Sequence, residues 1–489
     1  MNQQISKEQN PHFAEDAGPM STVDNSTKAV PHGSGALHAA APSNTFLAKV
    51  VILAILTPVL FNLGSLLMTT SRLVFIFLVP YLCINLLRGK YGPIKAADVF
   101  VALFIFWIGI SIAKNNPSSL VTFVGMNALA FLGGYLTARA CIRNEKDFID
   151  VYKFLAWVIV LLLPLAVYEA ITSNFVIPAL IEKIPGVFSR TEVDYPRRLG
   201  LDRAQVVFDH PIHWGTFASI GFSASLVAFR SIWGRGKRLL FGFLIGVACF
   251  VSVSSGPFLA LLFQLALIIY WLMFRKFRGL WVFLICGFVF LYILAELLSD
   301  RPAFYAIASR MAFNSSTANV RMVLLEYGIA QIGRTPLMGV GYNYWGLPQW
   351  MSGSMDNYWL LNAVVYGLPA LFFLVAVFAT LMGEAARRKF DPDSPVADVR
   401  RAWMIAMFGL ILTLATVAVW AEMTSIVFFI IGSGAFLGSV DITRRDEEGV
   451  APPDAATSQR AANRFTRFPA HERDRSGATK RFNQDRQRK

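Results

Sequence analysis

The sequence is dominated by a succession of apolar segments, about twelve of them, each long enough to cross a bilayer about 30 Å thick. Hydrophobic residues make up 55% of the chain and charged residues only 16%, which is more apolar surface than a soluble protein could bury. This pattern excludes a soluble enzyme, a disordered chain and a disulfide scaffold, and it predicts an all-α polytopic membrane protein. The segments lie near residues 46–68, 73–88, 97–113, 118–138, 152–172, 211–230, 238–255, 257–274, 279–299, 358–383, 402–420 and 424–440.

Basic residues alternate from one loop to the next. Lys and Arg gather near 88–95, 139–153, 230–238, 275–278 and 387–401, whereas the short loops between them carry almost none. Because cytoplasmic loops are enriched in Lys and Arg, we expect both termini to lie in the cytoplasm. The formal net charge of +14 then reflects topology, since no basic helix or aromatic sheet motif indicates nucleic-acid binding.

The composition divides the chain into three predicted parts. Residues 1–44 and 441–489 are polar and predict disordered cytoplasmic tails, while 45–440 form the transmembrane domain. The basic C-terminal tail would face anionic lipid and attract it weakly. No cleavable signal peptide is apparent, and the four cysteines lack metal-ligand spacing.

Two long loops on the non-cytoplasmic side, about 173–210 and 300–357, break the charge pattern. They carry arginines, among them Arg198, Arg203 and Arg321. A guanidinium binds phosphate through two parallel hydrogen bonds, so we interpret the two clusters as a site for an anionic ligand. For any single arginine, pairing with phospholipid headgroups or with local acids is the alternative.

The first loop ends in His210-Pro211 with His213 three residues later, which places both histidines on one face of a helix. A metal would need further ligands, and no third is obvious. The alternative is a helix entry, with Pro211 in the first turn and His210 or Asp209 near the cap.

Three glutamates, Glu169, Glu296 and Glu422, lie near the outward ends of predicted spans. Ionisable groups in such positions are often functional, and interface snorkelling is the alternative.

The second loop has internal structure of its own. Thr317 predicts the cap of an amphipathic helix of about four turns, lying along the membrane surface or in a cleft. Gly339 and Gly341 follow beside Tyr342, in a turn that we expect to bring backbone close to a ligand. Asp356 precedes a span and is either a general base or the N-cap of that span.

Taken together, these residues resemble the O-antigen polymerase and ligase superfamily of bacterial membrane glycosyltransferases. The resemblance covers about residues 200–361, and the other spans match only by topology. In ligases of the family a His precedes the Asn, whereas this chain has Asp356, which fits the exopolysaccharide polymerases better. The matching residues are Arg203 with Phe208-Asp-His210-Pro211, Ser316 with Arg321, then Pro336, Gly339 and Gly341, and finally Asp356-Asn357-Tyr358-Trp-Leu360.

The resemblance implies a GT-C-like fold with about 12 helices and a large periplasmic loop that partly covers a cleft. It also implies transfer of a glycan from undecaprenyl pyrophosphate to an acceptor sugar, in the bacterial inner membrane, without metal or cofactor. On this basis Arg203 and Arg321 would stabilise the leaving pyrophosphate, with Asp356 as general base and His210 as rival base or as hydrogen-bond donor to the phosphates. The candidate substrate-binding residues are Arg198, His213, Tyr342, Asn357 and Glu169.

The function expected is therefore a polymerase that joins lipid-linked repeat units into exopolysaccharide or O-antigen. Its partners would be the lipid-linked donor and acceptor, membrane lipids, a flippase and a chain-length regulator. A ligase that transfers the glycan to lipid A core is the first alternative. A transporter or flippase is the second, although related halves and midplane polar breaks are not clearly visible.

Overall fold

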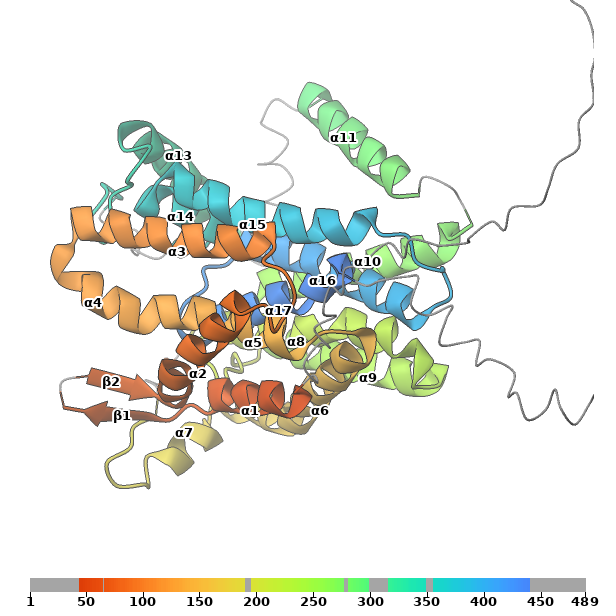
Figure 1. Ribbon diagram of the computed structural model, residues 1–489, viewed down its shortest axis with the longest axis horizontal. Helices are drawn as coiled ribbons and strands as arrows, with labels where there is room; N and C mark the ends of the chain where they lie inside the picture. Colours follow the sequence, from red (N-terminus) through yellow and green to blue (C-terminus); the bar gives the residue numbers. More distant parts are fainter. Residues whose placement is uncertain are drawn as a thin grey trace, which may run out of the picture. The chain divides into compact units, whose positions relative to one another are not determined.

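The computed structural model describes residues 44–64, 66–189, 195–276, 280–298, 315–348 and 355–439. The predicted tails fall outside these residues, except for Asn44, and so does part of the second long loop. The described part is built almost entirely of helices, with one two-stranded sheet (Figure 1).

The elements follow one another as a series of long helices joined by short connections. The first half comprises α1 (Thr45–Leu56), β1 (Leu60–Leu63), β2 (Leu66–Thr69), α2 (Thr70–Leu87), α3 (Ala96–Asn115), η1 (Pro117–Ser119), α4 (Leu120–Phe123), η2 (Val124–Ala128), α5 (Leu129–Cys141), α6 (Glu145–Thr172) and α7 (Val176–Ile181). The second half comprises α8 (Pro211–Leu226), η3 (Ala228–Ser231), α9 (Arg235–Phe250), α10 (Ser255–Phe274), α11 (Leu280–Leu298), α13 (Ser315–Arg334), α14 (Tyr358–Tyr366), α15 (Leu368–Arg387), α16 (Pro395–Leu414), α17 (Ala421–Ser433) and η4 (Ala435–Gly438).

Eight of the described helical segments are long and apolar enough to cross a membrane, judged by length and composition. This confirms the prediction of an all-α membrane protein. The helix predicted after Thr317 is also present, as α13, but it begins earlier than expected, at Ser315, so Thr317 lies within the helix and is not its cap.

The first predicted span, 46–68, is not one helix. Helix α1 ends at Leu56, and the chain then forms the antiparallel hairpin β1–β2, in which Leu60 pairs with Thr69. The cause is local, because Pro58 disfavours helical backbone at the residue before it, and Thr57 is accordingly extended.

The span predicted over 358–383 is divided too. Helix α14 ends at Tyr366 and α15 begins at Leu368, because Gly367 takes a φ of +88° that helical residues cannot adopt. The span predicted over 402–420 ends earlier than expected, at Leu414.

Two helices, α8 and α17, are enclosed by the others, and most of the residues of the segments Pro211–Ser231 and Ala421–Gly438 that contain them are buried. Helix α17 packs against α5 at close range, since a Cβ at Gly134 would overlap the carbonyl of Ser425. Small residues permit such close approach of helix backbones in membranes. Both enclosed helices begin at the site described below.

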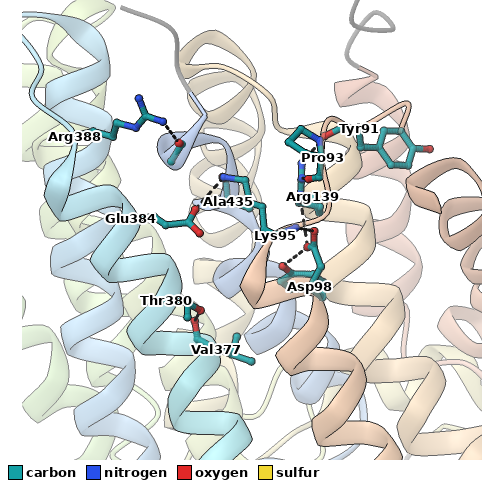
Figure 2. Close-up of polar contacts among 12 residues, drawn as sticks. Tyr91, Pro93, Lys95, Asp98, Arg139, Val377, Thr380, Glu384, Arg388 and Ala435 are labelled. Carbon is teal, nitrogen blue, oxygen red and sulfur yellow. Dashed lines mark hydrogen bonds and ion pairs between the residues drawn. The ribbon is translucent and has the colours of Figure 1, made fainter. Parts of the chain in front are cut away.

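A polar network ties together the start of α3, the ends of α5 and α15, and η4 (Figure 2). The Lys95 ammonium donates to Glu384 over 3.0 Å and to the carbonyl of Ala435 over 2.6 Å. Asp98 accepts from the backbone N–H of Lys95 and from Tyr135, and Arg139 lies 3.4 Å from it. Because every charge here has a partner, the network fixes the relative positions of these helix ends.

Candidate active site

A cavity of about 400 Å³ opens where the two long loops meet the helix ends. We call it the basic cavity, because three arginines line it. It brings together five of the residues predicted from the sequence, namely Arg198, Arg203, His210, Arg321 and Asp356. Its other lining residues are Tyr195, Ile212, Ser254, Ser255, Gly256, Val417 and Trp420.

Glu169 holds the loop that carries Arg203. Its buried carboxylate accepts the backbone N–H groups of Gln205 and Val206 at 3.0 and 2.8 Å. Val206 is β-branched yet has a φ of +55°, a strained conformation that persists only where the surroundings enforce it. Glu169 therefore positions Arg203 from behind the loop and is not itself among the lining residues of the cavity.

The Arg203 side chain is 7% exposed and points its guanidinium between two polar neighbours. It donates to the Ser254 hydroxyl over 3.0 Å and lies 5.2 Å from the Tyr195 ring centre. Burial, with a further contribution from Arg198, lowers the pKa of Arg203 to about 10, so it stays charged at neutral pH. No described residue accepts from its Nε, which leaves donor capacity for a ligand.

Arg321 reaches the cavity from α13. It donates to the carbonyl of Thr416 over 3.1 Å, and no described residue accepts from its Nε either. Burial lowers the pKa of Arg321, and the charge of Asp356 opposes that shift. The charge of Asp356 also raises the pKa of Arg203, so this carboxylate lies within electrostatic range of both arginines.

His210 is the N-cap of α8, as one of the sequence alternatives proposed. Its Nδ1 accepts from the backbone N–H of Ile212 over 3.0 Å. Burial and the charges of Arg203 and Arg198 lower the pKa of His210 to about 3, so the ring is neutral at neutral pH. With Nδ1 accepting, the proton sits on Nε2, and His210 is a donor toward the cavity.

Four helices begin at this cavity. His210, Ser254 and Trp420 are the N-caps of α8, α10 and α17, and Asp356 directly precedes the N-cap of α14. Helix N-termini carry partial positive charge and unpaired N–H groups. Together with the three arginines they make the electrostatic potential of the cavity positive.

The N-cap alternative for Asp356 is wrong, because the cap of α14 is Asn357. The Asn357 side chain accepts from the backbone N–H of Leu360 over 3.0 Å. Asp356 is therefore left to face the cavity.

The turn at Gly339 and Gly341, which we call the glycine turn, approaches protein backbone and not the basic cavity. The N–H groups of Val340 and Gly341 donate to the carbonyls of Val364 and Val365 at the end of α14. A Cβ at Gly339 would overlap the Val365 carbonyl. The turn thus anchors the second loop to the α14–α15 junction.

Two further predicted residues lie outside the lining of the basic cavity. His213 is buried and packs on Trp420, with ring centres 4.1 Å apart. Tyr342 is half exposed near Asn116, to which its backbone N–H donates.

Sequence reasoning did not single out Tyr195, Ser254 or Trp420. For the latter two, the available signal was a polar break between neighbouring apolar segments, around Gly256 and around Glu422.

An apolar cavity of about 140 Å³ adjoins the basic cavity. The two share Ser255, Gly256, Arg321 and Asp356. The apolar cavity is otherwise lined mainly by Leu259, Met322, Leu324, Leu325, Leu360 and Leu412. A charged compartment and an apolar one therefore meet at Arg321 and Asp356.

Residues 239–375 match the family model described as O-antigen ligase. This match confirms the resemblance to the O-antigen polymerase and ligase superfamily. The matched segment contains Arg321, the glycine turn and Asp356, whereas Arg203 and His210 precede it. No curated protein matched the chain. Among the described residues, no group of three His, Cys, Asp or Glu is arranged to hold a metal ion.

Proposed function

We propose that the protein is a polysaccharide polymerase that joins undecaprenyl-pyrophosphate-linked repeat units into exopolysaccharide or O-antigen, without metal. The observation that carries this proposal is the junction of the apolar cavity with the basic cavity at Arg321 and Asp356. A lipid-linked pyrophosphate has two matching parts, a hydrocarbon chain that suits the apolar cavity and an anion that suits the basic cavity. The chain would lie along α10, α13, α14 and α16, with the pyrophosphate between the arginines.

In the reaction, the acceptor hydroxyl attacks the anomeric carbon of the donor sugar, the bond from that carbon to the pyrophosphate oxygen breaks, and the hydroxyl proton passes to a base. Negative charge grows on the departing pyrophosphate. Arg203 and Arg321 stabilise that charge, and His210 donates from Nε2 to a phosphate oxygen. Asp356 faces the cavity and takes the proton. Arg198 and Asn357 contact the donor.

The proposed topology has about twelve spans, with both termini cytoplasmic and the basic cavity facing the periplasm of a bacterial inner membrane. Helices α9, α11 and α16 would add to the eight segments that meet the length and composition criteria. Helix α1, which at 12 residues is too short to cross alone, would contribute the twelfth span together with the segment that follows it. A flippase and a chain-length regulator would be its protein partners, because the donor must be delivered outward and the product length set.

A ligase is the second candidate function, favoured by the description of the matching family model. It would use the same donor site and transfer the glycan to lipid A core. Asp356 stands where ligases of the family have a His, which favours the polymerase.

The test uses purified protein in nanodiscs with a lipid-pyrophosphate-linked repeat unit, and the products are resolved by size. We expect a ladder from the wild type and a loss of about 100-fold or more in rate for Arg321→Gln. Arg334→Gln, at the exposed end of the same helix, is the matched control and should keep the ladder. If the ladder is absent and product forms only when lipid A core is added, the protein is a ligase.

A further inference from the structure

Trp420 separates the basic cavity from a second set of cavities. Two cavities, of about 200 and 220 Å³, are both lined by Arg72, Ala421 and Glu422, and we call them the Glu422 cavities. Trp420 lines both the basic cavity and the larger of these two. Asp209 lines the smaller one, directly before His210 in the chain. The two sites therefore share a wall made of Trp420 and the 209–210 segment.

The charge of the Glu422 cavities is opposite to that of the basic cavity. Their charged lining residues are Arg72, Asp209 and Glu422, and Arg72 lies within electrostatic range of both carboxylates. A site with this balance disfavours a pyrophosphate, because two carboxylates would repel it. It favours a neutral ligand that offers several hydroxyl donors to the carboxylates and acceptors to the guanidinium.

The remaining lining residues fit a sugar. Thr69, Ser71, Asn127 and Ser425 supply short polar groups, while Trp420, Phe75 and Met126 supply apolar surface. Binding sites for small polar molecules combine apolar and aromatic walls with a few placed polar groups. Such a wall suits the apolar face of a sugar ring.

The backbone at this wall is held in a strained form. Ala421 has a φ of +49°, which costs free energy for a residue with a Cβ. Its neighbours Trp420 and Glu422 line the two sides of the wall, and His213 packs on Trp420. Strain of this kind persists where the surrounding structure enforces it, often at functional sites.

We propose that the Glu422 cavities bind the acceptor sugar, with Glu422 and Asp209 accepting from its hydroxyls and Trp420 packing against its ring. This inference rests on the proposed function, which puts the donor lipid at the far side of the basic cavity, near Arg321. The donor sugar then points toward Trp420, and the acceptor hydroxyl approaches past that residue. Glu422 does not line the basic cavity, so its role is binding of the acceptor and not of the pyrophosphate.

The test measures the reaction rate while the concentration of an acceptor oligosaccharide is varied at a fixed donor concentration. The oligosaccharide is released by mild acid from the host's lipid-linked pool. For Glu422→Gln we expect the acceptor KM to rise about tenfold, with an unchanged Kd for undecaprenyl pyrophosphate. Asp209→Asn should act in the same direction, and it keeps the test decisive if Glu422→Gln does not fold. Glu326→Gln, an exposed carboxylate on α13, is the matched control and should change neither constant.

An unchanged acceptor KM in folded Glu422→Gln and Asp209→Asn would overturn the inference. A weaker Kd for undecaprenyl pyrophosphate in these variants would also overturn it, because Glu422 and Asp209 would then support binding of the donor's lipid pyrophosphate and not only of the acceptor. Failure of the wild type to bind undecaprenyl pyrophosphate at all would instead refute the proposed function.

Discussion

At the scale of single residues, two adjacent side chains at the start of α14 have different roles. Asn357 caps the helix, whereas Asp356 faces both the basic and the apolar cavity. The sequence places a carboxylate and an amide side by side, and both are good N-caps, so only the backbone path decides between them. The start of α8 posed the same choice, since either His210 or Asp209 could be its cap, and the structure shows that the cap is His210.

The two roles predict separable effects. Asn357→Ala should lower the free energy of unfolding by about 1 kcal/mol, because α14 loses its cap, and Asn357→Asp should restore it. Asp356→Asn should leave thermal stability unchanged while lowering kcat by about 100-fold, because the proposed base is lost. Thermal unfolding and turnover of the three variants check this. A loss of stability in Asp356→Asn with normal turnover would make Asp356 a structural residue.

At the scale of elements, long apolar helices were predictable and their interruptions were not. The apolar length of 46–68 predicts one span, although Thr57-Pro58 inside it ends the helix before the hairpin. The break at Gly367 was missed for the same reason, because hydropathy does not register backbone conformation. Gly339 and Gly341 were recognised as a turn, but the surface that the turn approaches depends on tertiary packing.

This anchor of the second loop can be tested at Gly339. Gly339→Ala should lower the free energy of unfolding by about 2 kcal/mol or more, because the residue has a φ of +62° and its new Cβ would overlap the Val365 carbonyl. Gly333→Ala, in α13 with open space around it, is the control and should be neutral or stabilising. Equal stabilities of the two variants, measured by thermal unfolding, would contradict the packing described for the turn.

At the scale of the whole molecule, the arginines of two loops far apart in sequence meet at one cavity. Their common side followed from the alternation of basic loops, so their approximate proximity could be predicted. The apolar cavity beside Arg321 and the wall at Trp420 could not, because each is formed by helices that are distant in the chain. Only that packing places the basic cavity beside the Glu422 cavities.

The proposed topology predicts which loops a membrane-impermeant maleimide reaches. In a background with the four native cysteines replaced by serine, Leu199→Cys should react in spheroplasts, because residue 199 is exposed in the first long loop. Lys389→Cys should react only after permeabilisation, because it lies in a basic loop. Reaction of both positions from the same side would refute the topology.

The most direct test of the central claim, that Arg203 and Arg321 hold the pyrophosphate of a lipid-linked donor, is the binding of undecaprenyl pyrophosphate to the protein in nanodiscs. We predict that Arg203→Gln and Arg321→Gln each raise its Kd at least about tenfold, because each removes a charge-assisted contact, while Arg334→Gln leaves it unchanged. We also predict that the wild type binds undecaprenyl monophosphate more weakly, because that ligand carries less charge. A Kd that is the same in the wild type and in both arginine variants would contradict the account.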